Sequence, residues 1–191
     1  MNSPKRFDAR ESHFPPATVT LAEHLKDGSC RDFRHSIYLV VHAAARLTEM
    51  RTAFAEEISV TPNQFLILMC IAYQSETEGL SIAALANELG LASTHVTTDV
   101  GRLTRAGLLK KRPHETDKRS VLVTLTDQGR AAIEKVVPLV QFVNDILFND
   151  VSREERETMS RVALKLIRNG ERAETELRIR SLGKISTSDS S

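Results

Sequence analysis

Apolar residues recur at helical spacing along most of the chain, which predicts a mostly helical protein. Thr61 followed by Pro62 is typical of a helix start, because a capping hydroxyl precedes a residue that fits the first turn. Thr126 and Ser152 are expected to cap two later helices. Gly90 is placed to end a helix in a left-handed turn. The helices are predicted over residues 31–57, 62–74, 82–89, 93–106, 127–148 and 152–178.

The pattern changes between the fourth and fifth of these helices. Residues 108–112 and 121–125 are short β-prone runs, and the second is rich in β-branched side chains. Polar residues 113–119 join them, which predicts a β-hairpin. A helix-turn-helix followed by a hairpin is a winged helix-turn-helix. The expected fold class is therefore mostly α with a small β-hairpin wing, and Pro138 is expected to kink the long helix that follows.

Composition suggests how the chain is divided. Residues 1–30 contain several prolines among polar residues and are interpreted as an N-terminal extension, with a short helix around Leu21 to Lys26. Residues 61–130 form the winged helix-turn-helix lobe, whereas 31–60 and 131–180 form a helical dimerisation region. Residues 181–191 are rich in serine and small polar residues, which predicts a flexible tail.

The two C-terminal helices are more apolar than helices at the edge of one small domain need to be. We therefore expect a second copy of the chain to cover them, although an entirely intramolecular core is the alternative. The apolar positions are Ile133, Val136, Val137, Leu139, Val140, Phe142, Val143, Ile146, Leu147, Val162, Leu164, Leu166 and Ile167.

The helix predicted over 93–106 has two unlike faces. Val96, Val100 and Leu103 share one face and are expected to pack on the domain core. The opposite face combines short hydroxyls, a glycine and arginines, which suits close approach to a DNA groove better than a solvated face would require. An ordinary polar helix face is the alternative. The candidate DNA-binding residues on this helix are Ser93, Thr94, His95, Thr97, Thr98, Arg102 and Arg105.

Charge supports the same surface. The chain is nearly neutral, with 26 Lys and Arg against 25 Asp and Glu, but residues 101–119 contain seven basic and two acidic residues, a net of +5. This is the electrostatic pattern expected of a DNA-binding surface. In the hairpin loop, Lys118 and Arg119 are further DNA-binding candidates, and Asp117 is expected to brace Arg119 for entry into a narrow minor groove. The alternative is that these residues only stiffen an exposed loop.

Several motifs together resemble the MarR family of transcriptional regulators. The wing with its Asp-x-Arg pattern, the strand after it and Leu-Thr-x-x-Gly make the resemblance specific. It is strong over residues 61–130, and the flanking helices agree in order over roughly 32–178. The motifs are Ser81–Leu91, Val96–Thr97, Arg102–Leu103, Ala106–Leu109, Thr116–Thr126 and Gly129.

This resemblance implies a homodimer that binds double-stranded DNA at a pseudo-palindromic operator, with one recognition helix in each half-site. It implies a repressor released by a small-molecule effector, either an aromatic acid or its CoA ester, and it places Arg119 at the wing tip. Thr98, Asp99 and Gly101 depart from the usual residues of the family, so contacts by Thr98 and Gly101 are weaker expectations.

Tyr38, His42 and Arg46 follow one another at intervals of four on the first helix and form a polar stripe. That helix is expected to lie beside Phe65 and Met69. Arg46 could then receive a ligand carboxylate while Tyr38 and His42 orient it, so these five residues are the ligand-binding candidates. A surface stripe or a dimer-interface network is the alternative.

Two other kinds of sensing stay open for the same fold. Cys30 lies near Arg31 and Arg34, which could activate its thiol for redox sensing. His35 and His42 share a helix face, but no H-x-x-H or C-x-x-C pair supports a metal site. Cys70 lies in an apolar run and is interpreted as a small core residue.

Other functional classes fit less well. The sequence contains no nucleophile elbow, no phosphate-binding glycine loop and no carboxylate pair placed for acid–base chemistry, so neither an enzyme nor a cofactor is expected. A winged helix that binds protein is an alternative, but it would present an apolar recognition face. Reduced cysteines and the lack of a signal or membrane segment predict a cytoplasmic protein without a membrane partner.

Overall fold

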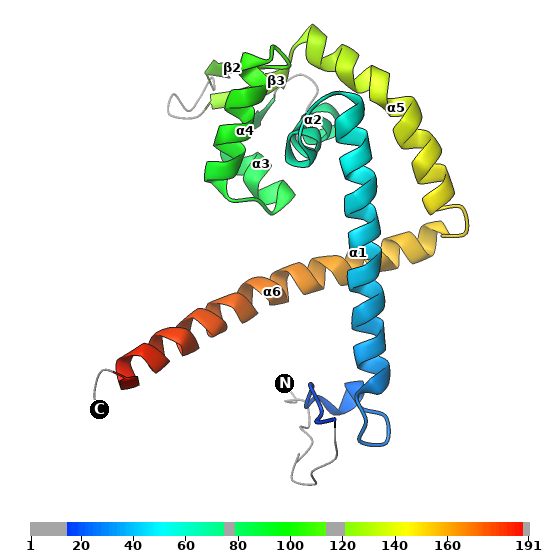
Figure 1. The fold of residues 1–191 in the computed structure, drawn as a ribbon, viewed down its shortest axis with the longest axis vertical. Coiled ribbons are helices and arrows are strands. Elements are labelled where there is room, and N and C mark those ends of the chain that lie inside the picture. The colour runs from blue at the N-terminus through cyan, green and yellow to red at the C-terminus, as the bar shows by residue number, and fades with distance from the viewer. Residues whose placement is uncertain (1–14, 75–78, 114–120, 189–191) are drawn as a thin grey trace. The chain divides into compact units, whose positions relative to one another are not determined.

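The computed structural model describes residues 15–74, 79–113 and 121–188 (Figure 1). A short 3-10 helix, Ala22–His24, precedes the main elements. These elements confirm the predicted fold class and the predicted element order. They are α1 (Arg31–Glu57), α2 (Pro62–Gln74), β1 (Leu80–Ser81), α3 (Ile82–Leu89), α4 (Ser93–Arg105), β2 (Leu109–Pro113), β3 (Val121–Leu125), α5 (Asp127–Leu147) and α6 (Arg153–Ser188).

Local hydrogen bonds account for the helix boundaries. The Thr61 Oγ1 accepts from the backbone N–H of Gln64 at 3.3 Å, while the Gln64 Oε1 accepts from the N–H of Thr61 at 3.1 Å. This reciprocal capping box starts α2. The Ser81 Oγ accepts from the N–H of Ala84 at 3.1 Å and caps α3, which Gly90 ends with φ of +62°.

The sheet has three strands in the order β1-β3-β2, and both pairings are antiparallel. The predicted hairpin forms with Leu109 opposite Leu125 and Lys111 opposite Val123. Strand β1, in which Leu80 lies opposite Val123, was not predicted. A strand of two residues is too short for apolar and polar positions to alternate visibly, so periodicity could not reveal it.

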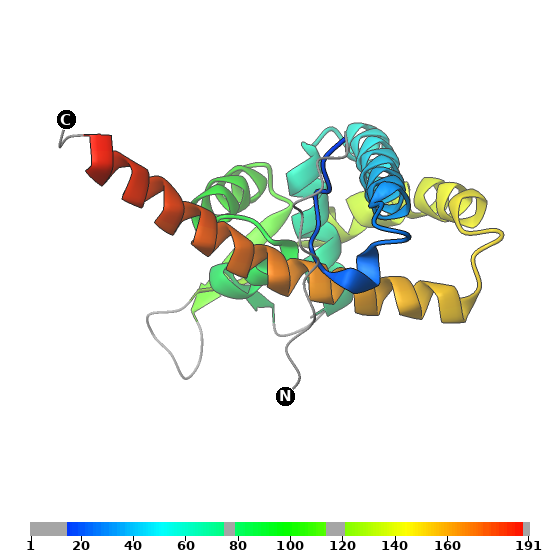
Figure 2. The ribbon, with the colours of Figure 1, turned by 90° about the horizontal axis from the view of Figure 1, so that it is seen from below.

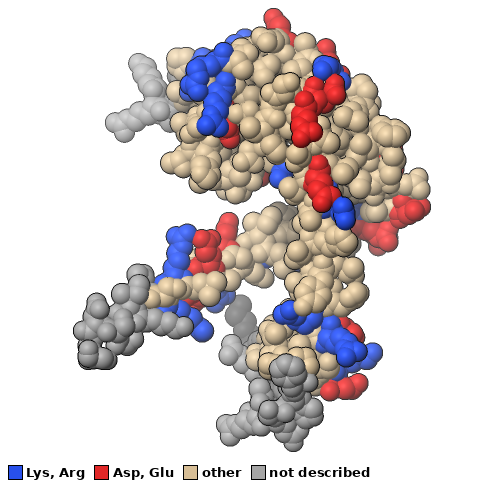
Figure 3. All heavy atoms as spheres, in the orientation of Figure 1, with Lys and Arg blue, Asp and Glu red and all other residues tan. Residues whose placement is uncertain are grey.

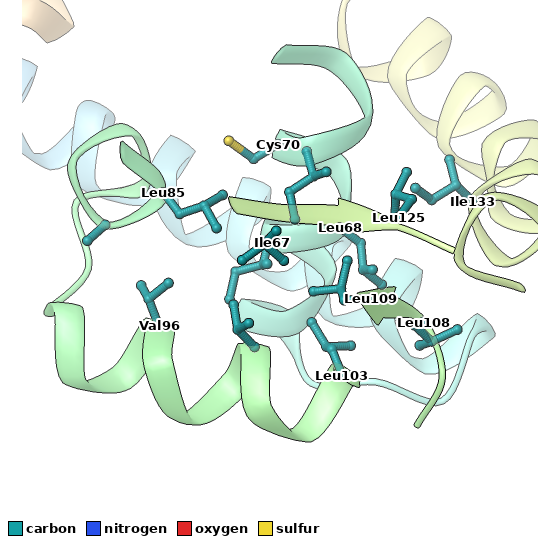
Figure 4. Close-up of a cluster of buried hydrophobic side chains, with 14 residues drawn as sticks. Ile67, Leu68, Cys70, Leu85, Val96, Leu103, Leu108, Leu109, Leu125 and Ile133 are labelled. Carbon is teal, nitrogen blue, oxygen red and sulfur yellow. The ribbon is translucent and has the colours of Figure 1, made fainter. Parts of the chain in front are cut away.

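The core lies where α2, α3, α4 and the sheet meet (Figure 4). Ile67, Leu68 and Ile71 of α2 are almost completely buried. The inner side of α4 packs into the same cluster through Val96, Val100 and Leu103. Burial of each such side chain contributes roughly 1.5–3 kcal/mol, so this contact holds α4 firmly to the lobe.

The chain divides into two compact units, Met1–Val140 and Gln141–Ser191, with the boundary two residues after Pro138 inside α5. The second unit contains the end of α5 and the single long helix α6, coloured orange to red in Figures 1 and 2. No helix in the described parts of the chain is both long and apolar enough to cross a bilayer.

The start of α6 has the predicted cap. The Ser152 Oγ accepts from the Glu155 N–H at 3.2 Å, and the Glu155 carboxylate accepts from the hydroxyl and the backbone N–H of Ser152 at 2.7 and 2.9 Å. These hydrogen bonds lower the pKa of Glu155. The stabilisation they give is therefore present above the carboxyl's ordinary pKa and is lost as the pH falls through its lowered value.

The other end of α6 differs from the predicted helix boundary. The helix continues through Ser188 rather than ending near Arg178, and so extends into the segment predicted as a flexible tail. Serine and threonine are only moderately unfavourable in helices, and no proline interrupts this segment. Extending an existing helix costs far less than nucleating a new one, which composition alone does not capture.

Gly129 should be intolerant of a side chain. It lies in the first turn of α5, where its N–H donates to the Thr126 Oγ1 at 3.0 Å, and an added Cβ would lie 2.1 Å from the backbone oxygen of Leu108. We expect Gly129→Ala to lower the free energy of unfolding by about 1–3 kcal/mol, because a backbone atom must move.

Gly170→Ala is the matched control for chemical denaturation of these variants. Gly170 also lies in a helix, but nothing lies within 4 Å of an added Cβ there. Alanine should therefore be neutral or stabilising by up to about 1 kcal/mol. Equal destabilisation by the two substitutions would contradict the close packing at Gly129.

Candidate nucleic-acid interface

The two faces of α4 are separated as the sequence predicts. Val96 and Val100 are completely buried and Leu103 is almost so. The outer side of the helix is open to solvent in the described chain. Its exposed residues include all seven DNA-binding candidates of this helix: Ser93, Thr94, His95, Thr97, Thr98, Arg102 and Arg105.

The N-terminus of α4 has no side-chain cap. Its N-cap is Ala92, whose methyl group cannot accept a hydrogen bond from the first turn. The N–H groups at the start of a helix also carry the positive end of the helix dipole. Backbone donors beside Ser93 and Thr94 are therefore available to an anionic phosphate.

The threonine hydroxyls of α4 bond within the helix. The Thr97 Oγ1 donates to the carbonyl of Ser93 at 2.8 Å, and the Thr98 Oγ1 donates to the carbonyl of Thr94 at 3.0 Å. In this arrangement each threonine offers an acceptor oxygen and a methyl group to a partner, rather than a hydroxyl donor. A methyl group on a recognition helix can contact the methyl of thymine.

A buried carboxylate lies beneath the outer face. Asp99 is only 8% exposed, and its Oδ1 accepts from the Gln64 Nε2 at 3.1 Å and from an Nη1 of Arg102 at 3.4 Å. Gln64 is the residue of the α2 capping box, so a polar chain links the start of α2 to an exposed arginine of α4. The burial of Asp99 was not predicted, although its place beside the stripe of Val96 and Leu103 is a signal for it in the sequence.

Positive charge gathers beside this helix. Residues 93–113 contain five Lys and Arg side chains and one acidic residue, Asp99, giving a net of +4. Figure 3 shows Lys and Arg side chains grouped over α4 and β2. The wing candidates Asp117, Lys118 and Arg119 lie outside the described residues.

The structure does not bring the five ligand-binding candidates together within one chain. Phe65 is buried, with its ring centroid 5.8 Å from that of Phe54, and Met69 packs beside the core. Tyr38 lies sixteen residues before Phe54, about 24 Å along α1 at 1.5 Å per residue. Tyr38, His42 and Arg46 are instead exposed on α1.

Local partners also occupy two members of this stripe. An Nη2 of Arg34 donates to the Tyr38 hydroxyl at 2.5 Å, and this hydrogen bond raises the pKa of the Arg34 guanidinium. An Nη1 of Arg46 lies 2.7 Å from a carboxylate oxygen of Glu49. A ligand carboxylate would have to displace Glu49 before it could pair with Arg46.

Known proteins share this arrangement. A model of the MarR family matches residues 60–121, which include α2, α3, α4, β2 and the first residue of β3. The HTH-type transcriptional regulator PecS of Dickeya dadantii is 33% identical over 115 residues, 58% of this chain and 69% of that protein. The chain belongs to the MarR family. It is a transcriptional regulator of this family and not an enzyme.

Solved structures of MarR-type regulators have the same fold. The M. tuberculosis regulator MOSR, solved in complex with DNA, has 25% identity and a TM-score of 0.55, and the match covers 71% of this chain and 97% of MOSR. BpsR of Bordetella bronchiseptica, solved to explain the regulation of its DNA binding by 6-hydroxynicotinic acid, has 24% identity and a TM-score of 0.56. That match covers 69% of this chain and 98% of BpsR.

The two cysteines of this MarR protein differ in environment. Cys70 is buried, and burial raises the pKa of its thiol. Hydrogen bonding to Thr18, whose Oγ1 lies 3.8 Å from the sulfur, lowers the pKa of Cys30, and the nearby Arg34 adds to this effect. Across the described ranges, no three His, Cys, Asp or Glu side chains are grouped closely enough to hold a metal ion.

Cys30 should therefore react first with thiol reagents. At neutral pH we expect iodoacetamide to alkylate Cys30 several-fold faster than the cysteine of an unstructured peptide, once the rates are corrected for the solvent accessibility of the thiol. The reason is that a larger fraction of the Cys30 thiol is ionised. The alkylation rate should also reach half its maximum at a lower pH than for the peptide. Mass spectrometry of wild type and Cys30→Ser measures both quantities; rapid labelling of Cys70 in the folded protein would contradict this assignment.

Proposed function

We propose that this regulator binds a pseudo-palindromic DNA operator as a homodimer, represses transcription there and is released by a small aromatic acid or its CoA ester. The outer face of α4 is the observation that carries the DNA-binding part. It is exposed, free of acidic side chains among its described exposed residues and fixed to the lobe by a buried apolar stripe. Recognition helices of helix-turn-helix proteins enter the major groove in this way.

The proposed roles of the individual residues follow their positions. Ser93 and Thr94 lie at the uncapped start of α4 and suit a phosphate. His95, Thr97 and Thr98 follow on the same helix and suit base edges. Arg102 and Arg105 add charge at its C-terminal half, and Arg119 is proposed to enter the minor groove, with Lys118 beside it and Asp117 as its brace.

Exposed apolar residues support the dimer. Side chains of α1 and α6 that would normally be buried are between 40% and 65% exposed in the single chain. Exposed apolar area of this kind marks an interaction surface. We propose that a second copy covers these residues: Ile37, Leu39, Val40, Val41, Leu47, Val162, Leu164, Leu166 and Ile167.

The DNA-binding proposal predicts how affinity depends on salt. Wild-type protein should select duplexes from a random pool, bind them as two chains per duplex in sedimentation experiments, and lose affinity steeply as salt rises. Arg105→Ala should weaken binding and reduce the slope of log K against log salt by about one per removed phosphate contact. Arg119→Ala should weaken binding without changing the melting temperature.

Arg172→Ala in α6 is the matched control, since it removes one arginine that lies on a different element. It should leave affinity and slope unchanged. A flat salt response of the wild type, or equal effects of the Arg105 and Arg172 substitutions, would contradict the proposed interface and favour a protein-binding winged helix.

The effector proposal rests on the family relation and on the exposed stripe of α1. In the dimer, Tyr38, His42 and Arg46 could face a ligand with the partner's help, whereas Phe65 and Met69 contribute to the wall of the lobe. A thermal-shift screen with 6-hydroxynicotinic acid, other aromatic acids and their CoA thioesters should give a compound that raises the melting temperature and releases DNA. With Arg46→Ala, about ten times more ligand should be needed for the same shift in melting temperature, as expected for a lost charged hydrogen bond.

Redox sensing is the second candidate, favoured by the lowered pKa of Cys30. The same screen includes organic peroxides and zinc. Release of DNA by peroxide in wild type but not in Cys30→Ser, with no response to aromatic acids, would replace the proposed effector by an oxidant.

A further inference from the structure

Within its described residues 93–113, the candidate interface contains one acidic group, Asp99, at a position that faces the apolar core. It lies one turn from Val96 and from Leu103, so it points toward the lobe rather than toward solvent, and its side chain is only 11% exposed. The arginine that pairs with Asp99 is more than half exposed, and ion pairs open to solvent contribute little to stability. A neutral side-chain oxygen could accept from the buried Gln64 amide as well, so stability alone gives no reason for a carboxylate here.

The hydrogen bonds of Asp99 connect two elements. One oxygen, Oδ1, accepts from the Gln64 amide of α2 at 3.1 Å and from the Arg102 guanidinium of α4 at 3.4 Å. The Gln64 amide is itself held, because its Oε1 accepts from the N–H of Thr61 at 3.1 Å. The capped start of α2 thus holds the carboxylate in place through Gln64. The carboxylate in turn restrains Arg102, whose side chain is 57% exposed.

We propose that Asp99 is a positioning residue for DNA recognition, which holds the Arg102 guanidinium in one orientation toward the duplex. This inference rests on the proposed function. A planar guanidinium recognises guanine through two parallel hydrogen bonds, so its value depends on orientation. An arginine that is held in place loses less conformational freedom on binding than a mobile one.

The charge of Asp99 also bears on discrimination between DNA sequences. A carboxylate beneath the interface repels phosphates everywhere along the duplex, which lowers the affinity for any sequence. Only a duplex with a guanine placed to accept two hydrogen bonds from Arg102 regains the affinity lost through this repulsion. Asp99 therefore raises the ratio of specific to non-specific affinity while lowering the non-specific affinity itself.

The test uses full-length protein and two probes: a duplex selected by the wild type from a random pool, and the unselected pool. Asp99→Asn keeps an oxygen that can accept from Gln64 but removes the charge that holds Arg102. We expect about tenfold weaker binding to the selected duplex, unchanged or tighter binding to the pool, and a melting temperature within a few degrees of the wild type. Glu174→Gln removes one exposed carboxylate of α6, which pairs with Arg178, and should change neither affinity.

A double-mutant cycle separates positioning from mere folding. In an Arg102→Ala background, Asp99→Asn should cause no further loss on the selected duplex, because the residue through which it acts is gone. Arg102→Lys changes only an exposed side chain and keeps its charge, so it should reduce discrimination about tenfold while leaving the salt slope unchanged.

The outcomes are distinct. If Asp99→Asn weakens binding to both probes equally, or has the same effect with and without Arg102, the positioning role is overturned. Full discrimination by Arg102→Lys overturns it as well, even if Asp99→Asn fails to fold. If the wild type selects no duplex at all, the proposed DNA-binding function fails first, and this inference fails with it.

Discussion

The packing of α4 against α2 determines which side chains of α4 can reach a DNA duplex. Val96, Val100 and Leu103 bury one side of α4 in a cluster that includes Ile67 and Leu68. Because a helix turns by about 100° per residue, burial of these three positions decides which residues face outward. Packing in the core, rather than the conformational preference of α4 alone, therefore determines that the hydroxyls and arginines of the outer face point toward solvent.

Hydrogen bonds hold α4 in place in addition to its apolar packing. The Thr61–Gln64 capping box holds the start of α2 and, through Asp99, reaches Arg102 on the outer face. Thr126 makes a similar link at the other end of the lobe, since its hydroxyl donates to the carbonyl of Gly107 and accepts from the N–H of Gly129. The candidate recognition helix is thus held at its middle and just beyond its C-terminal end by residues that also cap neighbouring helices.

Much of this fold could be predicted from the sequence because its signals are local. Caps at Thr61, Thr126 and Ser152, together with the left-handed Gly90, placed helix boundaries within one or two residues. The stripe on α4 predicted both its buried and its exposed side. These signals depend on neighbours within one turn, which the sequence displays directly.

The features that could not be predicted depend on distant contacts or on helix propagation. Strand β1 is defined only by its pairing with β3, and the bond from Gln64 to Asp99 spans 35 residues. The continuation of α6 through Ser188 reflects propagation from a formed helix rather than local preference. The ligand candidates Tyr38 and Phe65 were grouped from sequence, but the position of Phe54 against Phe65 places them far apart within one chain.

The outer face of α4 is proposed to meet DNA. Photo-crosslinking tests this most directly, with benzoylphenylalanine placed at the exposed edge position His95 and, as a control, at the exposed position Arg172 of α6. We predict crosslinks to a bound duplex from position 95 and none from position 172. Crosslinking from α6 with none from α4, under conditions where the protein still binds the duplex, would contradict this proposal.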